Sequence, residues 1–185
     1  SSLIKDLKDQ EQLCIDKYQK HSSCAKDEQL KTLFTQIAAV EKTHLDTLTK
    51  LEQGNTAPGG NEPAVNKTFS AKYTVAPNPD KDNDAYLCSD VLAGEKHVSS
   101  LYDTCIFEFK DDNARNILNH IQKEEQEHGK IIYDYMTVNS MYSANEGYSF
   151  AYWKNSAGVV LSTSAEATFK VSTNTSVIAV FDKAP

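Results

Sequence analysis

The chain carries one set of four motif residues twice, and the two copies are separated by a constant 84 positions. Each copy has a glutamate followed seven positions later by a tyrosine, and then a glutamate followed three positions later by a histidine. The copies are Glu11, Tyr18, Glu41 and His44, and then Glu95, Tyr102, Glu125 and His128. Because no insertion interrupts this offset, we predict two similar units related by pseudo-twofold symmetry.

Apolar side chains accompany the motifs at steps of three and four residues, which is the pattern of an amphipathic helix. The pattern covers residues 3–53 and residues 85–137, and it breaks once in each segment, at Lys26-Asp27 and at Lys110-Asp111. Asp27 is suited to cap the second helix of the first segment. We therefore predict two helical hairpins with the motif glutamates inside their apolar stripes.

The spacing within each hairpin brings the motif residues to one level. Glu11 and Glu41 are 30 residues apart, and so are Glu95 and Glu125. Each glutamate therefore lies about 15 residues, or roughly 22 Å, from the turn of its hairpin. The histidines share the helix faces of their glutamates. We predict an all-α four-helix bundle in which four carboxylates and two imidazoles converge.

This residue set predicts a site for two metal ions. A glutamate from each of two helices, with a Glu-x-x-His pair from each of the other two, is the ligand set of dinuclear sites in four-helix bundles. Buried carboxylates repel one another and lose hydration, and two cations would compensate their charge. The predicted ligands are Glu11, Glu41, His44, Glu95, Glu125 and His128. Such ligands favour iron or manganese, with Glu41 and Glu125 bridging the ions, and affinity alone does not exclude zinc.

Tyr18 and Tyr102 follow Glu11 and Glu95 by two helical turns on the same faces. They are the candidate catalytic residues, because a phenol there can hydrogen-bond a ligand carboxylate or pass an electron. A role as ordinary core aromatics explains them equally well. The remaining histidines and the glutamates that flank the last motif are assigned to the surface or to local hydrogen bonds: His21, His97, His120, Glu124 and Glu127.

Between the hairpins, residues 54–84 are rich in glycine and proline, including Pro77 and Pro79, a composition that opposes a helix. This segment predicts a long crossover connection between the second and third helices. The alternating apolar residues within it allow a short strand: Phe69, Ala71, Tyr73 and Val75.

Towards the end of the chain the helical period is lost, and short β-prone runs alternate with Asn, Ser, Gly and Thr. The runs cover residues 148–153, 158–161, 168–171 and 177–181. We predict two domains, a bundle over residues 1–143 and a small β-rich appendage over residues 144–185. So small a core is expected to dock on a partner, exchange with a neighbour or form half of a larger unit.

The overall composition excludes some partners. A net charge of −7 and a pI of about 5.2 argue against nucleic acid or an anionic membrane surface as the main partner. No apolar stretch reaches the roughly 18 residues of a membrane span, and no signal-peptide pattern is visible. The cysteines lack C-x-x-C spacing, so we expect them to be reduced and packed, with a disulfide or a redox role as the alternative.

The duplicated motifs resemble those of the ferritin-like superfamily, and their spacing looks like that of rubrerythrins. Over about residues 3–143 the chain is more similar still to coat-F-like spore coat proteins of clostridia, through the stretches 87–90, 95–102 and 120–128. The resemblance implies a di-iron carboxylate protein, an oxidoreductase acting on dioxygen or hydrogen peroxide, in the cytoplasm or the spore coat. It also implies a homo-oligomer and an electron donor, which the sequence does not identify.

Two departures from rubrerythrins favour a second hypothesis. Val98 stands where they carry a further glutamate, three residues after the ligand Glu95, and a cysteine-bound rubredoxin domain is missing. Residues 146–181 resemble instead the later strands of internalin-type B-repeats of bacterial surface proteins. The second hypothesis is a structural spore coat or surface assembly protein with a vestigial or purely structural metal site.

Overall fold

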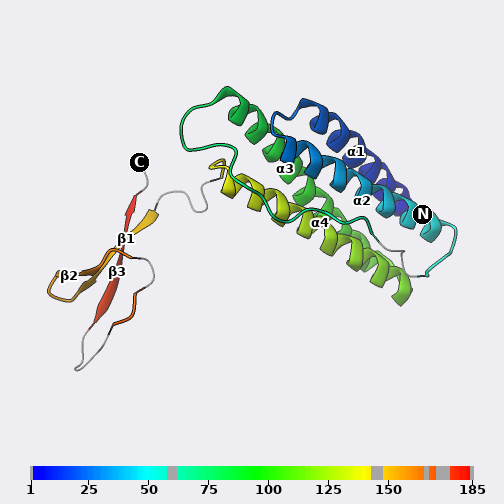
Figure 1. The fold of residues 1–185 in the computed structure, drawn as a ribbon. Helices are drawn as coiled ribbons and strands as arrows, with labels where there is room; N and C mark the ends of the chain where they lie inside the picture. The colour runs from blue at the N-terminus through cyan, green and yellow to red at the C-terminus, as the bar shows by residue number, and fades with distance from the viewer. Residues whose placement is uncertain (1, 58–61, 143–147, 165–166, 170–175, 184–185) are drawn as a thin grey trace. The chain divides into compact units, whose positions relative to one another are not determined.

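The computed structural model describes residues 2–57, 62–142, 148–164, 167–169 and 176–183. The chain divides into two compact units, Ser1–Tyr142 and Ser143–Pro185. All described helices lie in the first unit and all described strands in the second (Figure 1). A helical bundle with a small β appendage is thereby confirmed.

The first unit consists of two antiparallel helical hairpins. The helices are α1 (Ser2–Cys24), α2 (Glu28–Glu52), α3 (Pro79–Glu108) and α4 (Asp112–Val138). The turns of the two hairpins are built alike, because an aspartate caps the helix that follows each turn. The Asp27 carboxylate accepts from the backbone N–H of Gln29, and that of Asp111 accepts from the N–H of Ala114. The predicted cap at Asp27 is confirmed.

Helix α3 begins earlier than its sequence pattern indicates. We placed residues 79–84 in the connection because of Pro77 and Pro79, but the helix starts at Pro79. A proline is favourable in the first turn of a helix, where its missing N–H would have no partner. The Asn78 side chain caps this end by accepting from the N–H groups of Asp80 and Lys81.

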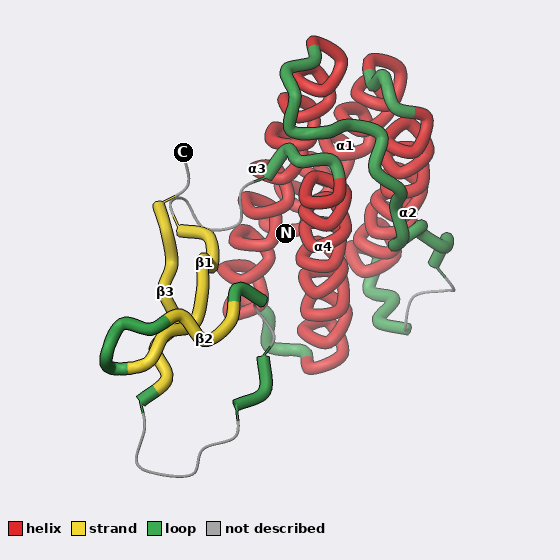
Figure 2. Tube along the Cα trace, turned by 60° about the vertical axis from the view of Figure 1, so that its left-hand side comes forward, coloured by secondary structure: helices red, strands yellow, loops and turns green. Residues whose placement is uncertain are grey.

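The connection between α2 and α3 returns along the outside of the bundle, so that α3 begins beside the α1–α2 turn (Figures 1 and 2). The short strand predicted around Phe69 and Tyr73 is wrong, since this part has no regular structure. Side chains of the helices bind its backbone instead. Gln29 hydrogen-bonds both the N–H and the carbonyl of Ser70. Asn139 accepts from the N–H groups of Lys72 and Tyr73.

The core of the first unit draws on all four helices. Its largest fully buried side chains include three tyrosines, one phenylalanine and many leucines and isoleucines. Three of the cysteines are buried, Cys14, Cys88 and Cys105, whereas Cys24 is exposed. None of the four forms a disulfide. No described helix is long and apolar enough to cross a membrane. The six predicted metal ligands are among its buried polar and charged residues, whereas the buried Asp27, Lys81 and Asp84 lie near the starts of α2 and α3.

The second unit is a three-stranded antiparallel sheet in the order β2-β1-β3. Its strands are β1 (Tyr148–Asn155), β2 (Val160–Ser162) and β3 (Val177–Lys183). The β-prone run predicted at residues 168–171 forms no strand at Thr168 and Phe169. Its last two residues lie outside the residues that the structure describes. The rings of Phe150 and Phe169 pack against Trp153, with centroids 5.4 and 5.9 Å away.

Candidate metal centre

All six predicted ligands are buried at one level of the bundle, and each helix contributes at least one of them. At most 3 % of any of the six residues is exposed. Glu11 comes from α1, Glu41 and His44 from α2, Glu95 from α3, and Glu125 and His128 from α4. The equal spacing of the glutamates from the hairpin turns therefore brings the six side chains together, as the sequence predicts.

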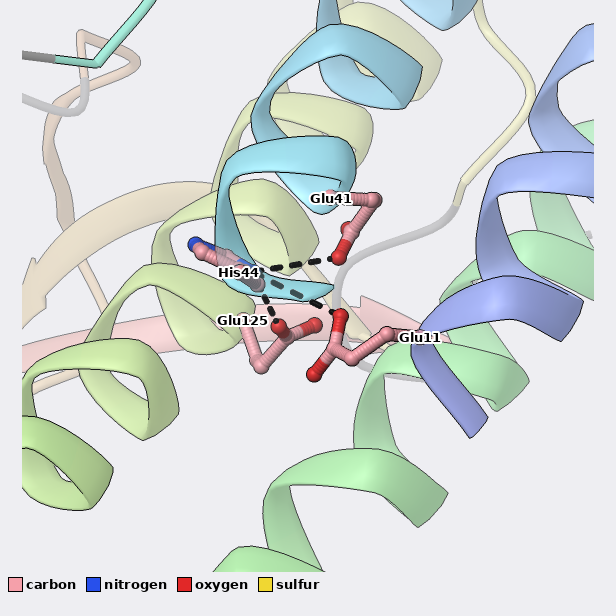
Figure 3. A group of neighbouring side chains, drawn as sticks. All are labelled: Glu11, Glu41, His44 and Glu125. Atoms are coloured by element: carbon pink, nitrogen blue, oxygen red, sulfur yellow. Dashed lines mark hydrogen bonds and ion pairs between the residues drawn. The ribbon is translucent and has the colours of Figure 1, made fainter. Parts of the chain in front are cut away.

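Four of these side chains surround a first candidate cation position. Ligand atoms of Glu11, Glu41, His44 and Glu125 all lie within 4.8 Å of one another. Figure 3 shows the three carboxylates turned towards the His44 ring. The Nδ1 atom of His44 lies 3.0 Å from an oxygen of Glu125, 3.2 Å from one of Glu41 and 3.6 Å from one of Glu11.

The second position repeats the first with the other hairpin's residues. Ligand atoms of Glu41, Glu95, Glu125 and His128 also lie within 4.8 Å of one another. The Nδ1 atom of His128 lies 3.0 Å from Glu41 Oε1 and 3.9 Å from Glu95 Oε2. Glu41 and Glu125 belong to both groups, which is the arrangement that bridging carboxylates require.

The two tyrosines connect the hairpins to each other. The Tyr18 hydroxyl donates to the carboxylate of Glu95, and the Tyr102 hydroxyl donates to that of Glu11. Each tyrosine thus hydrogen-bonds the glutamate of the opposite hairpin. The sequence did not indicate this pairing, because each tyrosine shares a helix face with the glutamate of its own hairpin. Burial raises the pKa of both phenols well above the usual value, so they remain protonated donors.

Glu124 contacts the candidate centre, a contact that was not predicted from the sequence. We assigned it to the solvated surface, but its side chain is only 15 % exposed and its Oε2 atom lies 2.9 Å from His44 Nε2. It accepts a hydrogen bond from the ring nitrogen that faces away from the centre. From the sequence one could expect only that a histidine ligand needs a hydrogen-bond acceptor for its second ring nitrogen. Which residue supplies it depends on how α4 packs against α2.

Several buried polar atoms of the centre lack a hydrogen-bond partner among the described residues. They are Oε2 of Glu11 and of Glu95, Oε1 of Glu41, both oxygens of Glu125, and Nδ1 of His128. Glu41 Oε1 lies 3.0 Å from His128 Nδ1, and Glu125 Oε1 lies 3.0 Å from His44 Nδ1, but neither contact forms a hydrogen bond. Leaving buried polar atoms without a hydrogen bond is costly. Two cations placed between these atoms would satisfy them, so the residues present fit a dinuclear metal site.

The electrostatics of the centre point in the same direction. Burial raises the pKa of Glu11 and of Glu125 to about 7, and repulsion between neighbouring carboxylates adds to the effect. The pKa values of Glu41 and Glu95 are raised for the same reasons. Burial lowers the pKa of His44, but the surrounding glutamates outweigh it and hold this pKa well above its usual value. The centre thus takes up protons unless other cations replace them.

Comparison with known families matches two segments of the chain, which overlap at residues 135–145. Residues 83–145, which contain most of α3 and all of α4, match the model of the Coat F domain. Residues 135–185 match the model of the divergent InlB B-repeat domain. Comparison with curated proteins and with solved structures finds no match. The predicted resemblance to internalin-type repeats is therefore confirmed, and the resemblance to coat-F proteins, predicted over residues 3–143, is confirmed for residues 83–145.

Proposed function

We propose that this chain is a spore coat component whose helical bundle holds a dinuclear metal centre. The proposal of a metal centre rests on one observation: two groups of four ligand residues share Glu41 and Glu125. The spore coat assignment rests on the match to the Coat F domain, which includes Glu95, Glu125 and His128. The first hairpin lies outside that match but carries the same motif residues.

In the proposed centre Glu11 and His44 would hold one ion, Glu95 and His128 would hold the other, and both ions would share Glu41 and Glu125. Carboxylates with a single imidazole per ion suit iron or manganese. The hydroxyls of Tyr18 and Tyr102 hold the carboxylates of Glu95 and Glu11 in place, and all six ligand side chains are buried. The ligand set and the long connection between α2 and α3 are also those of a ferritin-like protein.

Anaerobic titration with Fe(II) and with Mn(II), followed by metal analysis, tests the proposal. The purified chain should hold close to two ions. The Glu41→Ala and Glu125→Ala variants should each lose both ions, because either change removes a ligand from both groups. Glu127, whose side chain is 48 % exposed, provides the control, and Glu127→Ala should bind like the unaltered chain. A chain that stays empty, or a Glu41→Ala variant that still binds two ions, would contradict the proposal.

A second candidate function is oxidation chemistry with dioxygen or hydrogen peroxide. Bound iron would supply the redox chemistry, and the buried phenols of Tyr18 and Tyr102 lie in contact with the ligands Glu95 and Glu11. Val98 is buried where rubrerythrins carry a glutamate, so it provides no further ligand. Oxygen and peroxide consumption by the iron-loaded chain, with an added electron donor, tests this candidate. Iron loading without any consumption would leave a structural role for the centre.

A further inference from the structure

A cavity of about 510 Å³ lies between α3 and α4 and reaches the proposed centre. Its inner end is formed by the ligands Glu95 and Glu125, and its walls include Leu92 and Tyr133. This volume lies within the range of small-molecule binding sites, roughly 300–1,000 Å³. The cavity therefore gives a small molecule access to the Glu95 side of the centre.

Two small residues of the second hairpin line this cavity, and both replace large residues of the first. Gly129 and Ser99 lie 84 positions after Leu45 and Ile15, which are half-buried and buried. A Cβ atom at Gly129 would lie 3.5 Å from Leu92 Cδ1, so there is room for alanine at this position. A leucine there would extend into the cavity. Glycine is otherwise unfavourable inside a helix, which indicates that openness at this position has a use.

The lining determines the chemistry of the occupant. Leu92, Tyr133 and Tyr142 offer apolar and aromatic surface. Of the two lysines in the lining, Lys130 is bound to Asp134 at 2.6 Å, whereas no described residue forms an ion pair with Lys96. An apolar body would pack against the walls, and an anionic group would pair with the exposed Lys96 at a distance from the two carboxylates.

We propose that this cavity binds a small molecule with an apolar, aromatic or aliphatic body and one anionic group, next to Glu95 and Glu125. The role of the molecule as a ligand or substrate of the metal centre rests on the proposed function. Binding itself requires only the cavity and Lys96. The two proposals can therefore fail separately.

Fluorescence titration of the full chain with 1-anilinonaphthalene-8-sulfonate, an aromatic anion of suitable size, tests the proposal. We expect one probe molecule per chain. Gly129→Leu should weaken binding by about tenfold or more because the new side chain fills the cavity, whereas Gly129→Ala should change it little. Ser99→Ile fills the cavity from α3 and serves as the second test if Gly129→Leu does not fold. Lys96→Gln should weaken binding by about two- to fivefold.

Metal analysis of the same variants separates this proposal from the metal centre. Gly129→Leu should still take up two ions while losing the probe, because its side chain replaces no ligand. Equal probe binding by Gly129→Leu, Ser99→Ile and the unaltered chain would overturn the proposal. Failure of the unaltered chain to bind the probe would do the same. Binding that weakens as the protein concentration rises would show that a second copy covers the cavity, which also overturns it.

Discussion

His44 and His128 occupy equivalent positions in the repeat, but their outer ring nitrogens have different surroundings. Glu124 accepts from His44 Nε2, while the position equivalent to Glu124 in the first hairpin is Val40. Among the described residues, none hydrogen-bonds His128 Nε2. A carboxylate on the outer nitrogen orients a ligand imidazole and increases its basicity. We therefore expect the two proposed metal positions to differ in affinity, with the tighter one at His44.

Replacing Glu124 by glutamine tests this inequality. We expect the ion at His44 to bind about tenfold or more weakly in Glu124→Gln, because the imidazole loses its charged acceptor. Competition between the protein and a chelator for Mn(II) measures the two affinities. Glu127→Gln, one turn further along α4 and more exposed, is the matched control. Identical affinities in the two variants would show that Glu124 does not position His44.

The raised pKa values of Glu11 and Glu125, about 7 in each case, make the metal-free protein sensitive to pH. Between the ordinary glutamate value of 4.5 and about 7, the folded chain binds more protons than the unfolded chain. Its stability therefore falls as the pH rises through this interval. We expect the Tm of the metal-free protein to fall by roughly 5 °C or more between pH 5 and pH 7.5.

Thermal unfolding in the presence of a chelator measures this effect, and Mn(II) should reverse it. Cations compete with protons for the carboxylates, so the increase in Tm caused by Mn(II) should be larger at pH 7.5 than at pH 5.5. Glu11→Gln, which cannot titrate, should flatten the pH dependence of the metal-free protein. A metal-free protein that is more stable at pH 7.5 than at pH 5 would contradict the burial of these carboxyl groups.

Asp84 joins three elements at one end of the bundle. Its fully buried carboxylate on α3 accepts from the backbone N–H groups of Lys26 and Asp27 in the α1–α2 turn. It also accepts from the hydroxyl of Tyr73 in the connection that follows α2. This contact fixes the start of α3 against the first hairpin and holds the connection to the bundle.

Replacing Asp84 by alanine should destabilise the bundle by about 3 kcal/mol, because buried donors would lose their acceptor. Urea unfolding followed by circular dichroism at 222 nm measures the change. Asp82→Ala removes an exposed carboxylate from the same helical turn and should have a small effect. A similar loss of stability in both variants would mean that the charge near the start of α3 matters more than the contacts of Asp84.

At the scale of elements, the sequence predicted what depends on local periodicity. Apolar steps of three and four residues located both hairpins, and the capping preference of aspartate located the start of α2. Proline content misled the prediction at Pro79, because a proline opposes the interior of a helix but suits its first turn. Alternation around Tyr73 suggested a strand, but a strand needs a neighbouring strand, and helix side chains bind this backbone instead.

The only tryptophan of the chain, Trp153, lies in the β unit. Its Nε1–H donates to the carbonyl of Ser164. No described side chain of this unit is fully buried, whereas the bundle has a large core. Small sheets of this kind have little stability of their own. We therefore expect the two units to unfold separately.

Urea unfolding observed in two ways tests this expectation. Tryptophan fluorescence should report a midpoint roughly 1 M or more below the midpoint of the helical signal at 222 nm. A chain that ends at Tyr142 should keep the helical transition and the metal stoichiometry. Coincident transitions in the full chain would show that the β unit packs stably on the bundle. A change of oligomeric state on truncation would assign assembly to the β unit.

Spacing alone was enough to bring the six candidate ligands to one level, because a helix rises by a constant amount per residue and the repeat has no insertion. Three features depended on the tertiary structure: the pairing of Tyr18 with Glu95, the support of His44 by Glu124, and the cavity beside Gly129. Each arises from contacts between helices, which depend on how the helices rotate and pack. A period read along one helix contains no information about its neighbour, so a symmetric repeat can fold into an asymmetric centre.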